Sequence, residues 1–445
     1  MISLLQDLNR NIFRIRLFNN NNIADWKLDD ERIVLVPAGT SGYLFVPDNL
    51  CIFKVPFSIN SINEVIEDPG TIKAIHMGLL PLKGAKLKPI RKDRDITKIG
   101  IHFLITSACN MSCSYCIFNN QLKMRPNDSV NFDAIFDKII EITAATMPKE
   151  IDFTFTGGEP LLRFERIVKI VEFIETFCGE KGIKYTFQIT TNGSILTDQI
   201  LSYITEKKFR VTISLDGHLS WYKYTNDSRV LFFDAIIQNY ELIKKHCICN
   251  IRATIDEQPV LLSQRIQYLY ELTSGNLVVQ PDVQKPISVD TIVDLLKVDK
   301  QDVLNRKRVI NYNIRKIFKI LADFQYRDFG CGVGTNFFGI DNNGLIIPCS
   351  FFTGLSGQTF DSLYEMQTAN AINNIPLVSE RENCKHCCAK HICGGGCLYT
   401  QTLYKNDLVE NEAIHGACNY NIALLRYVIQ NYELLKANII KSVLN

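Results

Sequence analysis

The sequence predicts an α/β protein whose central domain is a partial barrel of six parallel βα units. Three observations support this fold class. Strand-like and helix-like segments alternate from about residue 98, as they do in parallel βα repeats. Turn motifs follow successive strands, at the end where barrel active sites form. Ten of the fifteen cysteines fall into two arrays, one inside the predicted barrel and one in a cysteine-rich region after it.

Six segments of apolar or alternating character are the expected strands. They are residues 99–106, 151–158, 184–193, 209–217, 249–255 and 276–284. Between them, residues 132–147 and 164–178 repeat apolar side chains every three or four positions, which predicts amphipathic helices against the sheet. Six units would leave the barrel open, because a closed barrel of this type has eight strands.

The chain divides into five predicted parts. In order they are a small N-terminal α+β domain at 1–95, the barrel at 96–285, a helical bridge at 286–325, a cysteine-rich domain at 326–420 and a C-terminal helix at 421–445. In the first part, short strands are expected within 12–55, and a helical stretch that Pro69 breaks is expected at 59–80. A basic, loop-like segment ending at residue 95 would join this domain to the barrel.

Composition indicates a large soluble protein and gives no sign of nucleic-acid or membrane binding. The 445 residues are 46% hydrophobic, and the formal net charge is +2. No apolar run is long enough to span a bilayer. The first residues lack a basic start followed by an apolar core, so no signal peptide is predicted and a cytoplasmic location is expected. Disulfides are rare in the cytoplasm, which favours metal ligation for the cysteine arrays.

The first cysteine array lies directly after the first predicted strand. Cys109, Cys113 and Cys116 have C-x3-C-x2-C spacing, which puts three thiolates on one loop. A closed structural cluster or zinc site needs four protein ligands, whereas catalytic metal sites keep one position open. The spacing therefore favours an iron-sulfur cubane with one open iron.

This array and the motif TGGEP at Thr156–Pro160 together resemble the radical S-adenosylmethionine (SAM) superfamily. The resemblance implies a [4Fe-4S] cluster whose open iron chelates the amino and carboxylate groups of SAM. It also implies an oxidoreductase in which a 5'-deoxyadenosyl radical removes a hydrogen atom from the substrate, while the protein supplies position and excludes water. An electron donor such as flavodoxin or ferredoxin is implied as a partner.

The resemblance assigns several residues to SAM by their position in these motifs. Tyr115 would lie near the adenine, while Gly157, Gly158 and Glu159 would approach the amino group. Ser214, in the SLDG motif after the fourth predicted strand, would hold the carboxylate.

The basic partner of that carboxylate has two candidates. Arg229 lies in the segment after SLDG where the family supplies such a residue, although the segment is shorter than usual here. Arg252 on the fifth predicted strand is the competing candidate. Asn192 in TTNG and Asp216 in SLDG are expected to shape their turns, because Asn-Gly and Asp-Gly are common turn formers.

The second cysteine array lies in the C-terminal third of the chain. Its seven members are Cys331, Cys349, Cys384, Cys387, Cys393, Cys397 and Cys418. Four of them form a C-x2-C-x5-C-x3-C core, and another follows Gly344 in a G-x4-C motif. This set resembles the SPASM domain, which carries auxiliary iron-sulfur clusters in peptide- and protein-modifying radical SAM enzymes. A zinc knuckle built from paired C-x2-C motifs is the structural alternative.

The SPASM resemblance distributes these cysteines over two auxiliary clusters, both expected to be [4Fe-4S]. The proposed ligands of auxiliary cluster I are Cys331, Cys349 and Cys397. The proposed ligands of auxiliary cluster II, which would be closed, are Cys384, Cys387, Cys393 and Cys418.

Cluster I lacks an obvious fourth ligand. Gln325 stands where many relatives have a cysteine, so one iron would be open or bound by Cys388, His386 or His391. The remaining cysteines are expected to be buried apolar filler, and they are Cys51, Cys178, Cys247, Cys249 and Cys388.

Three function classes are compatible with these motifs. The first is a maturase that cross-links a ribosomally made precursor peptide through a C-C, ether or thioether bond, as darobactin- and cyclophane-type enzymes do. The N-terminal domain would then resemble the RRE domains that take a peptide as an added strand, and a capping domain is the alternative. The second is anaerobic sulfatase maturation to formylglycine, whose enzymes have an aspartate where this chain has Ser350. The third is a non-catalytic cluster carrier, which the intact SAM motifs disfavour. No catalytic base is identified.

Overall fold

The computed structural model covers residues 1–445. The residues that it describes are 15–17, 33–38, 41–47, 51–56, 97–116, 128–225, 227–255, 262–273, 277–282, 312–322, 327, 331–334, 336–353, 357–368, 378, 380–381, 384–385, 387–403 and 412–436. The expected helical stretch at 59–80, the basic segment ending at 95, most of the bridge at 286–325, Gln325 and His386 lie outside these residues.

An eight-stranded sheet forms the centre of the fold, in the order β10-β9-β8-β7-β6-β5-β11-β12. Six of its strands run parallel and match the six predicted ones: β5 (Lys98–Leu104), β6 (Glu150–Thr156), β7 (Lys184–Thr191), β8 (Arg210–Ser214), β9 (Ile248–Ile255) and β10 (Leu277–Pro281). Within the described residues, β10 and β12 stand at the two edges and do not pair with each other. The predicted α/β class with an open parallel barrel is confirmed.

Two strands of the cysteine-rich region extend this sheet, which was not predicted. β11 (Phe337–Ile340) pairs in parallel with β5, and β12 (Ile346–Ile347) pairs antiparallel with β11. Phe337 lies opposite Gly100, and a Cβ on that glycine would come within 3.2 Å of the Phe337 ring. Backbone hydrogen bonds therefore join the cysteine-rich region to the strand that precedes the first cysteine array.

Side chains of the barrel strands alternate between an apolar face and a polar face. On β5, Ile99, Ile101 and Phe103 are buried in the main hydrophobic core, together with residues of the surrounding helices. His102, between them, is the neighbour of Thr154 on β6 and belongs to the other face. The interior of the barrel is consequently polar, and it is this face that lines the site described below.

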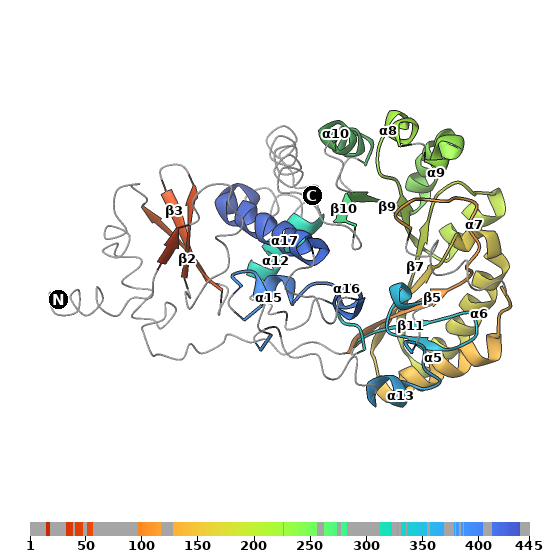
Figure 1. Ribbon diagram of the computed structural model, residues 1–445. Helices are drawn as coiled ribbons and strands as arrows, with labels where there is room; N and C mark the ends of the chain where they lie inside the picture. Colours follow the sequence, from red (N-terminus) through yellow and green to blue (C-terminus); the bar gives the residue numbers. More distant parts are fainter. Residues whose placement is uncertain are drawn as a thin grey trace.

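Helices cover the outside of the barrel (Figure 1). They are α5 (Phe132–Thr146), α6 (Phe164–Lys181), α7 (Asp198–Glu206), α8 (Leu219–Tyr224), α9 (Phe233–His246) and α10 (Leu262–Thr273), with the short 3-10 helices η2 (Pro160–Arg163) and η3 (Ser228–Phe232). Asn131 and Thr197 cap α5 and α7 by accepting hydrogen bonds from the backbone N–H of Ala134 and Ile200. α6 ends at Gly182 in the left-handed conformation. The predicted helices at 132–147 and 164–178 correspond to α5 and α6.

The C-terminal region contains α12 (Tyr312–Ala322), η4 (Ser350–Phe352), α13 (Leu363–Thr368), α15 (Lys390–Cys393), α16 (Leu398–Leu403) and α17 (Glu412–Gln430). α17 lies near the centre of the molecule and contacts α12, α15 and α16 (Figure 1). The C-terminal helix, expected from residue 421, begins at Glu412. The apolar period on which the prediction rested starts only after Cys418, so this cysteine lies inside the helix and not before it.

The N-terminal residues form a second sheet in the order β1-β2-β3-β4. Its strands are β1 (Ile15–Leu17), β2 (Ile33–Ala38), β3 (Ser41–Val46) and β4 (Cys51–Pro56), of which only the β1–β2 pair is parallel. β2 and β3 contact α17, and Val36, Phe45 and Leu435 share one hydrophobic core. The sheet is thus attached to the C-terminal helix. None of the described helices has both the length and the apolar character needed to cross a bilayer.

Candidate active site

One cavity connects the two cysteine arrays. It measures about 710 Å³ and lies at the carboxyl ends of the barrel strands. Cysteines of both arrays line it, namely Cys109, Cys113, Cys116, Cys331, Cys349, Cys393, Cys397 and Cys418. The predicted SAM residues Tyr115, Gly157, Gly158 and Ser214 line it as well. Cys116 and Cys331 are 215 positions apart in the sequence, and both face this cavity.

The cluster loop, residues 107–116, follows β5. Thr106, directly before the loop, is hydrogen-bonded to Asp128. Thr106 Oγ1 donates to Asp128 Oδ1 at 2.6 Å, and Arg163 Nε donates to Oδ2 at 2.9 Å. Arg166 Nη1 donates to the Ile105 carbonyl oxygen at 2.9 Å. Burial raises the pKa of Asp128, but the Thr106 hydrogen bond and the Arg166 charge outweigh it, so this pKa lies below its usual value. The start of the loop is thereby tied to η2 and α6.

The two glycines of TGGEP allow that segment to pair with the cluster loop. Gly158 N donates to the Thr106 carbonyl at 2.8 Å, and Glu159 N donates to the Ala108 carbonyl at 2.8 Å. Gly157 has φ +140°, and a Cβ at Gly157 or Gly158 would overlap the carbonyl oxygen of Thr106 or Ala108. Close approach between two backbones thus requires both glycines, in addition to any contact with SAM.

Glu159 does not reach the cavity, contrary to the expectation that its carboxylate contacts SAM. Its side chain is 0% exposed and absent from the residues that line the cavity. It accepts hydrogen bonds from Thr191 Oγ1 at 2.7 Å, Asn192 N at 2.7 Å and Leu161 N at 3.0 Å. Burial raises the pKa of Glu159, although these hydrogen bonds oppose the shift. The carboxylate therefore joins η2 to the end of β7, a geometry that spacing alone could not reveal.

Asn192 shapes its turn, as expected, and also holds the cluster loop. Its Oδ1 accepts from Ser194 N at 2.9 Å, which closes the turn. Its Nδ2 donates to Asn110 Oδ1 at 2.9 Å, and Asn110 Nδ2 donates in turn to Ser194 Oγ at 2.9 Å. The middle of the cluster loop is thus attached to the end of β7.

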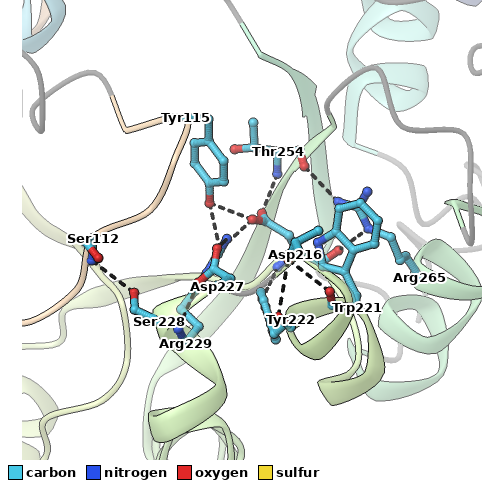
Figure 2. A network of polar contacts seen from close by, with 11 residues as sticks. Ser112, Tyr115, Asp216, Trp221, Tyr222, Asp227, Ser228, Arg229, Thr254 and Arg265 are labelled. Atoms are coloured by element: carbon cyan, nitrogen blue, oxygen red, sulfur yellow. Dashed lines mark hydrogen bonds and ion pairs between the residues drawn. The ribbon is translucent and has the colours of Figure 1, made fainter.

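A buried polar network attaches the end of the cluster loop to β8 and η3 (Figure 2). Tyr115 OH donates to Asp216 Oδ2 at 2.6 Å, and Arg229 Nη1 donates to the same oxygen at 2.5 Å. Arg229 also forms a two-point ion pair with Asp227, at 2.9 Å from Nε and 2.6 Å from Nη2. Its side chain is 2% exposed. Arg229 does not line the cavity, so the predicted contact with the SAM carboxylate has no support in this geometry.

Of the two candidate partners of the SAM carboxylate, Arg252 is the one that lines the cavity. It is the cross-strand partner of Ser214, since β8 and β9 pair these two residues, and both face the cavity. Burial lowers the pKa of Arg252 from a very high ordinary value. His102 lies nearby on β5, and burial together with the Arg252 charge lowers the pKa of this imidazole to about 3. A cation and a neutral imidazole therefore belong to the barrel interior near Ser214.

Three predicted cluster II ligands differ in their exposure to the cavity. Cys384 and Cys387 lie in a turn, where Cys387 N donates to the Cys384 carbonyl at 2.9 Å, and neither lines the cavity. Cys393 ends α15 and does line it. Burial raises the pKa of Cys393 to about 11. His391 is buried and its carbonyl accepts from Arg327 N at 3.0 Å.

Several cysteines outside the arrays are buried, as expected for apolar filler. Cys178 and Cys249 are 0% and 3% exposed, and Cys388 is 1% exposed beside Cys387. Cys247 is half-buried, with its Sγ 3.8 Å from Thr205 Oγ1. The side chain of Cys51 lies outside the described residues.

The cavity residues that sequence reasoning missed include two cationic ones, Lys316 on α12 and Arg327. Burial and the Arg327 charge lower the pKa of Lys316 to about 8. Both come from the region after the barrel, where no motif marks a functional residue. The C-terminal end of the cavity therefore carries cationic side chains next to the cysteines.

The first array fits a cubane better than a single metal ion. Within the described part of the chain, no three His, Cys, Asp or Glu side chains converge on a point that would hold one ion. In a cubane each thiolate binds a different iron, so the ligands stand apart around the cluster. Three thiols on one loop that faces an open cavity suit this arrangement.

Comparison with known proteins agrees with this geometry. The family model of the Radical SAM superfamily matches residues 103–256. Radical SAM cyclopropyl synthase TigE of Paramaledivibacter caminithermalis is 27% identical over 165 residues, which span 33% of this chain and 33% of TigE. The cysteine-type anaerobic sulfatase-maturating enzyme of Clostridium perfringens is 21% identical over 337 residues, which span 66% of this chain and 86% of that enzyme.

The architecture has a counterpart among solved structures. Native anSMEcpe with bound AdoMet matches 77% of this chain and 99% of its own, with a TM-score of 0.60 and 20% sequence identity. At this identity the likeness supports a shared fold. The chain therefore contains a radical SAM domain at residues 103–256, a type of domain that binds a [4Fe-4S] cluster and SAM.

Proposed function

We propose that this protein removes a hydrogen atom from a peptide substrate and joins the resulting radical to a second residue of the same peptide. The observation that carries this proposal is the single cavity of about 710 Å³ that both cysteine arrays line. A cross-link releases a second hydrogen as a proton and an electron. A substrate in this cavity would lie between the radical source and the C-terminal cysteines, where an auxiliary cluster could accept that electron.

The cluster end of the cavity is the proposed site of SAM. Cys109, Cys113 and Cys116 would bind the [4Fe-4S] cluster, since all three face the cavity from one loop. When bound, the reduced cluster and SAM supply a 5'-deoxyadenosyl radical. Closure of the cavity walls around substrate would exclude water from this radical.

Four cavity residues are proposed to orient SAM. The backbone at Gly157 and Gly158, which lines the cavity, would face its amino group, because neither residue has a side chain to block approach. Ser214 and Arg252 would hold its carboxylate, since they are cross-strand neighbours that both line the cavity. This replaces Arg229, whose guanidinium is already engaged by two carboxylates.

The far end of the cavity is the proposed site of auxiliary cluster I. Cys331, Cys349 and Cys397 all line it. Lys316 and Arg327 bring positive charge to this end, which suits a negatively charged thiolate cluster. Cluster II would lie at the edge of the cavity, because Cys393 and Cys418 line it and Cys384 and Cys387 do not.

A peptide is the proposed substrate for two reasons. The cavity volume lies in the range of sites for small ligands, about 300–1,000 Å³, so it can take SAM and a few side chains but no folded domain. In addition, solved anSMEcpe contains AdoMet together with Cp18Cys peptide, in a fold that resembles this one with a TM-score of 0.60. We favour two bond types, a cross-link at an aromatic side chain and a thioether bond.

The first experiment is anaerobic co-expression with the short peptides encoded beside this protein's gene, followed by mass spectrometry. A loss of two hydrogen atoms per event is expected, and fragmentation would locate the bond. The control is the triple variant Cys109→Ala, Cys113→Ala, Cys116→Ala, which should leave every peptide unmodified. Unmodified peptides with wild-type protein that still cleaves SAM would reject peptide cross-linking.

Sulfatase maturation is the second candidate, because the alignment with the Clostridium perfringens enzyme spans 86% of that enzyme. Ser350 lines the cavity at the position where the sulfatase-maturing enzymes have an aspartate. Among the described residues, Asp282 is the carboxylate that lines the cavity, so it would have to act as the base. Co-expression with an anaerobic sulfatase tests this candidate: an aldehyde that forms with wild type and disappears with Asp282→Asn would support it.

A further inference from the structure

The cluster loop is attached to the barrel at three places by side chains outside the cysteine motif. Its beginning is held by Asp128, its middle by Asn192 and its end by Asp216. We propose that Asp216 and Arg229 are positioning residues that hold residues 107–116 in the ligating conformation before iron or SAM binds. This inference rests on the proposed role of the loop as the ligand loop of the first cluster.

Asp216 is the centre of the third attachment. Its Oδ1 accepts from Thr254 N at 2.7 Å, which fixes the carboxylate to the backbone of β9. Its Oδ2 accepts from both Tyr115 OH, at 2.6 Å, and Arg229 Nη1, at 2.5 Å. The residue is 1% exposed. Both oxygens are therefore committed to protein donors, and the Tyr115 hydroxyl is held by a carboxylate that follows β8 and is bound to β9.

Arg229 is held by carboxylates at all three of its nitrogens. Asp227 accepts from two of its nitrogens in fork geometry, and Asp216 accepts from a third. The guanidinium carbon lies 4.5 Å from the centre of the Tyr222 ring and 5.2 Å from that of Tyr115. The arginine consequently fixes the Asp216 carboxylate and the Tyr115 ring together, and its charge is balanced without any ligand.

A second contact from the same short helix brackets Cys113. Ser228 Oγ accepts from Ser112 N at 3.0 Å, directly before the cysteine, while Tyr115 is attached two residues after it (Figure 2). Both contacts lead to η3, which contains Ser228 and Arg229. A loop segment that is pinned on both sides of a ligand has little freedom to move that ligand. The network therefore acts on the position of Cys113 and on the face that Tyr115 presents to the cavity.

A preformed loop has a measurable consequence in the absence of metal. Hydrogen exchange of residues 107–116, followed by mass spectrometry of the metal-free full-length protein, reports directly on loop opening. Tyr115→Phe removes only the hydroxyl, and Asp216→Asn removes the charge that both donors use. Exchange in the loop should become about tenfold faster in each variant, because each loses a hydrogen bond to a charged group.

Tyr270→Phe is the matched control. Tyr270 is 0% exposed, and its hydroxyl has no hydrogen-bond partner in the described part of the chain. The Tyr270→Phe variant thus loses a buried tyrosine hydroxyl without losing a hydrogen bond within the described residues. Hydrogen exchange of residues 107–116 in Tyr270→Phe should equal that of wild type. Hydrogen exchange in β7 should be unchanged in all variants.

A second measurement separates positioning from general stability. After cluster reconstitution, Asp216→Asn should raise the KM for SAM about tenfold while kcat for 5'-deoxyadenosine formation changes less, because the loss affects the geometry of the loop and not the chemistry. The electron paramagnetic resonance spectrum of the reduced cluster should also respond differently to SAM. Arg229→Lys should restore part of the loop protection that Arg229→Met loses.

The outcomes distinguish this inference from the proposed function. Loop exchange equal to wild type in folded Tyr115→Phe and Asp216→Asn protein would overturn the inference. If Asp216→Asn does not fold, Tyr115→Phe alone decides. Failure of the proposed function would look different: wild-type protein would not bind a cluster at the loop or cleave SAM, whatever the exchange rates of the variants.

Discussion

Gly158 shows how a single residue connects the two SAM motifs. Its N–H donates to Thr106, and its Cα lies so close to the Ala108 carbonyl that a side chain has no room. Because the obstacle is backbone and not a flexible side chain, the neighbour cannot give way without moving the cluster loop. The residue thus controls the distance between β6 and the first cysteine array.

We expect Gly158→Ala to destabilise the protein by about 2 kcal/mol or more, because overpacking against backbone forces the loop to shift. Iron at the first cluster should be lost, as measured by iron content and electron paramagnetic resonance. Gly179→Ala is the control, since an added Cβ there meets no atom within 4 Å. In the last turn of α6 this change should stabilise the protein by at most about 0.5–1 kcal/mol, the value for a helix interior. Equal iron content in both variants would contradict the prediction.

His102 gives the barrel interior a pH dependence. Burial and the Arg252 charge lower its pKa from 6.5 to about 3, so the folded protein resists a proton that the unfolded chain accepts. The contribution of His102 to stability is therefore complete above pH 6.5 and is lost as the pH falls toward 3. His102→Gln should flatten this part of the pH profile of the free energy of unfolding, measured by urea denaturation of metal-free protein. A His102 pKa near 6.5 by NMR would contradict the assignment.

Motif spacing predicted which residues approach the site, but not which way their side chains point. Tyr115, Ser214 and the two glycines face the cavity, and their contacts with SAM stay a prediction. Glu159 and Arg229 do not, because their partners are Thr191, Asp216 and Asp227, which only the folded chain brings together. Arg252 was predictable only as an alternative, since its role depends on the register of β8 and β9.

Among the described elements, α17 contacts several separate parts of the chain. It packs on α12, α15 and α16, contacts the N-terminal strands β2 and β3, and places Cys418 on the cavity. A helix holds a thiol more rigidly than a loop does. Cys418 is therefore a proposed ligand whose position depends on packing far from the barrel.

Cys418→Ser should remove iron from the auxiliary region while the first cluster keeps its iron, because the cluster loop is held by its own contacts with the barrel. Mössbauer or electron paramagnetic resonance spectra of the isolated centres would separate the two pools. Cys178→Ala is the control: this thiol is buried in α6 and belongs to neither array, so stability should fall but all iron should remain. Loss of the first cluster alone in Cys418→Ser would contradict the ligand assignment.

The long periodic elements were predictable, and the short ones were not. Strands β5 to β10 and helices α5 and α6 show clear periods of two or 3.6 residues, which their burial on one face explains. β11 and β12 have four and two residues, too few for a period, and they lie in a cysteine-rich stretch. Their position beside β5 depends on long-range pairing that no local pattern encodes.

At the scale of the whole molecule, the three proposed clusters should contribute unequally to the fold. The barrel strands and helices contribute most of the main hydrophobic core, whereas the described helices within residues 331–403 have six residues or fewer. Purified anaerobic protein should contain about twelve irons if all three sites are cubanes. Removal of iron by a chelator should expose residues 331–403 to proteolysis before the barrel, because binding energy at a metal site is folding energy for the segment that carries it. Proteolysis of residues 331–403 and of the barrel at the same time would contradict this order.

The pairing of β11 with β5 has one more consequence, for electron flow. The rate at which an electron tunnels between two redox centres falls steeply with their separation, so a small change in spacing alters the rate greatly. Here the strand that leads into the cluster loop and a strand of the cysteine-rich region belong to one hydrogen-bonded ladder. A substrate that enters or leaves the cavity can move side chains, but it cannot change this spacing without breaking the ladder. If clusters occupy both cysteine arrays as proposed, the sheet would act as a fixed spacer between them, and the tunnelling distance would stay constant through each turnover.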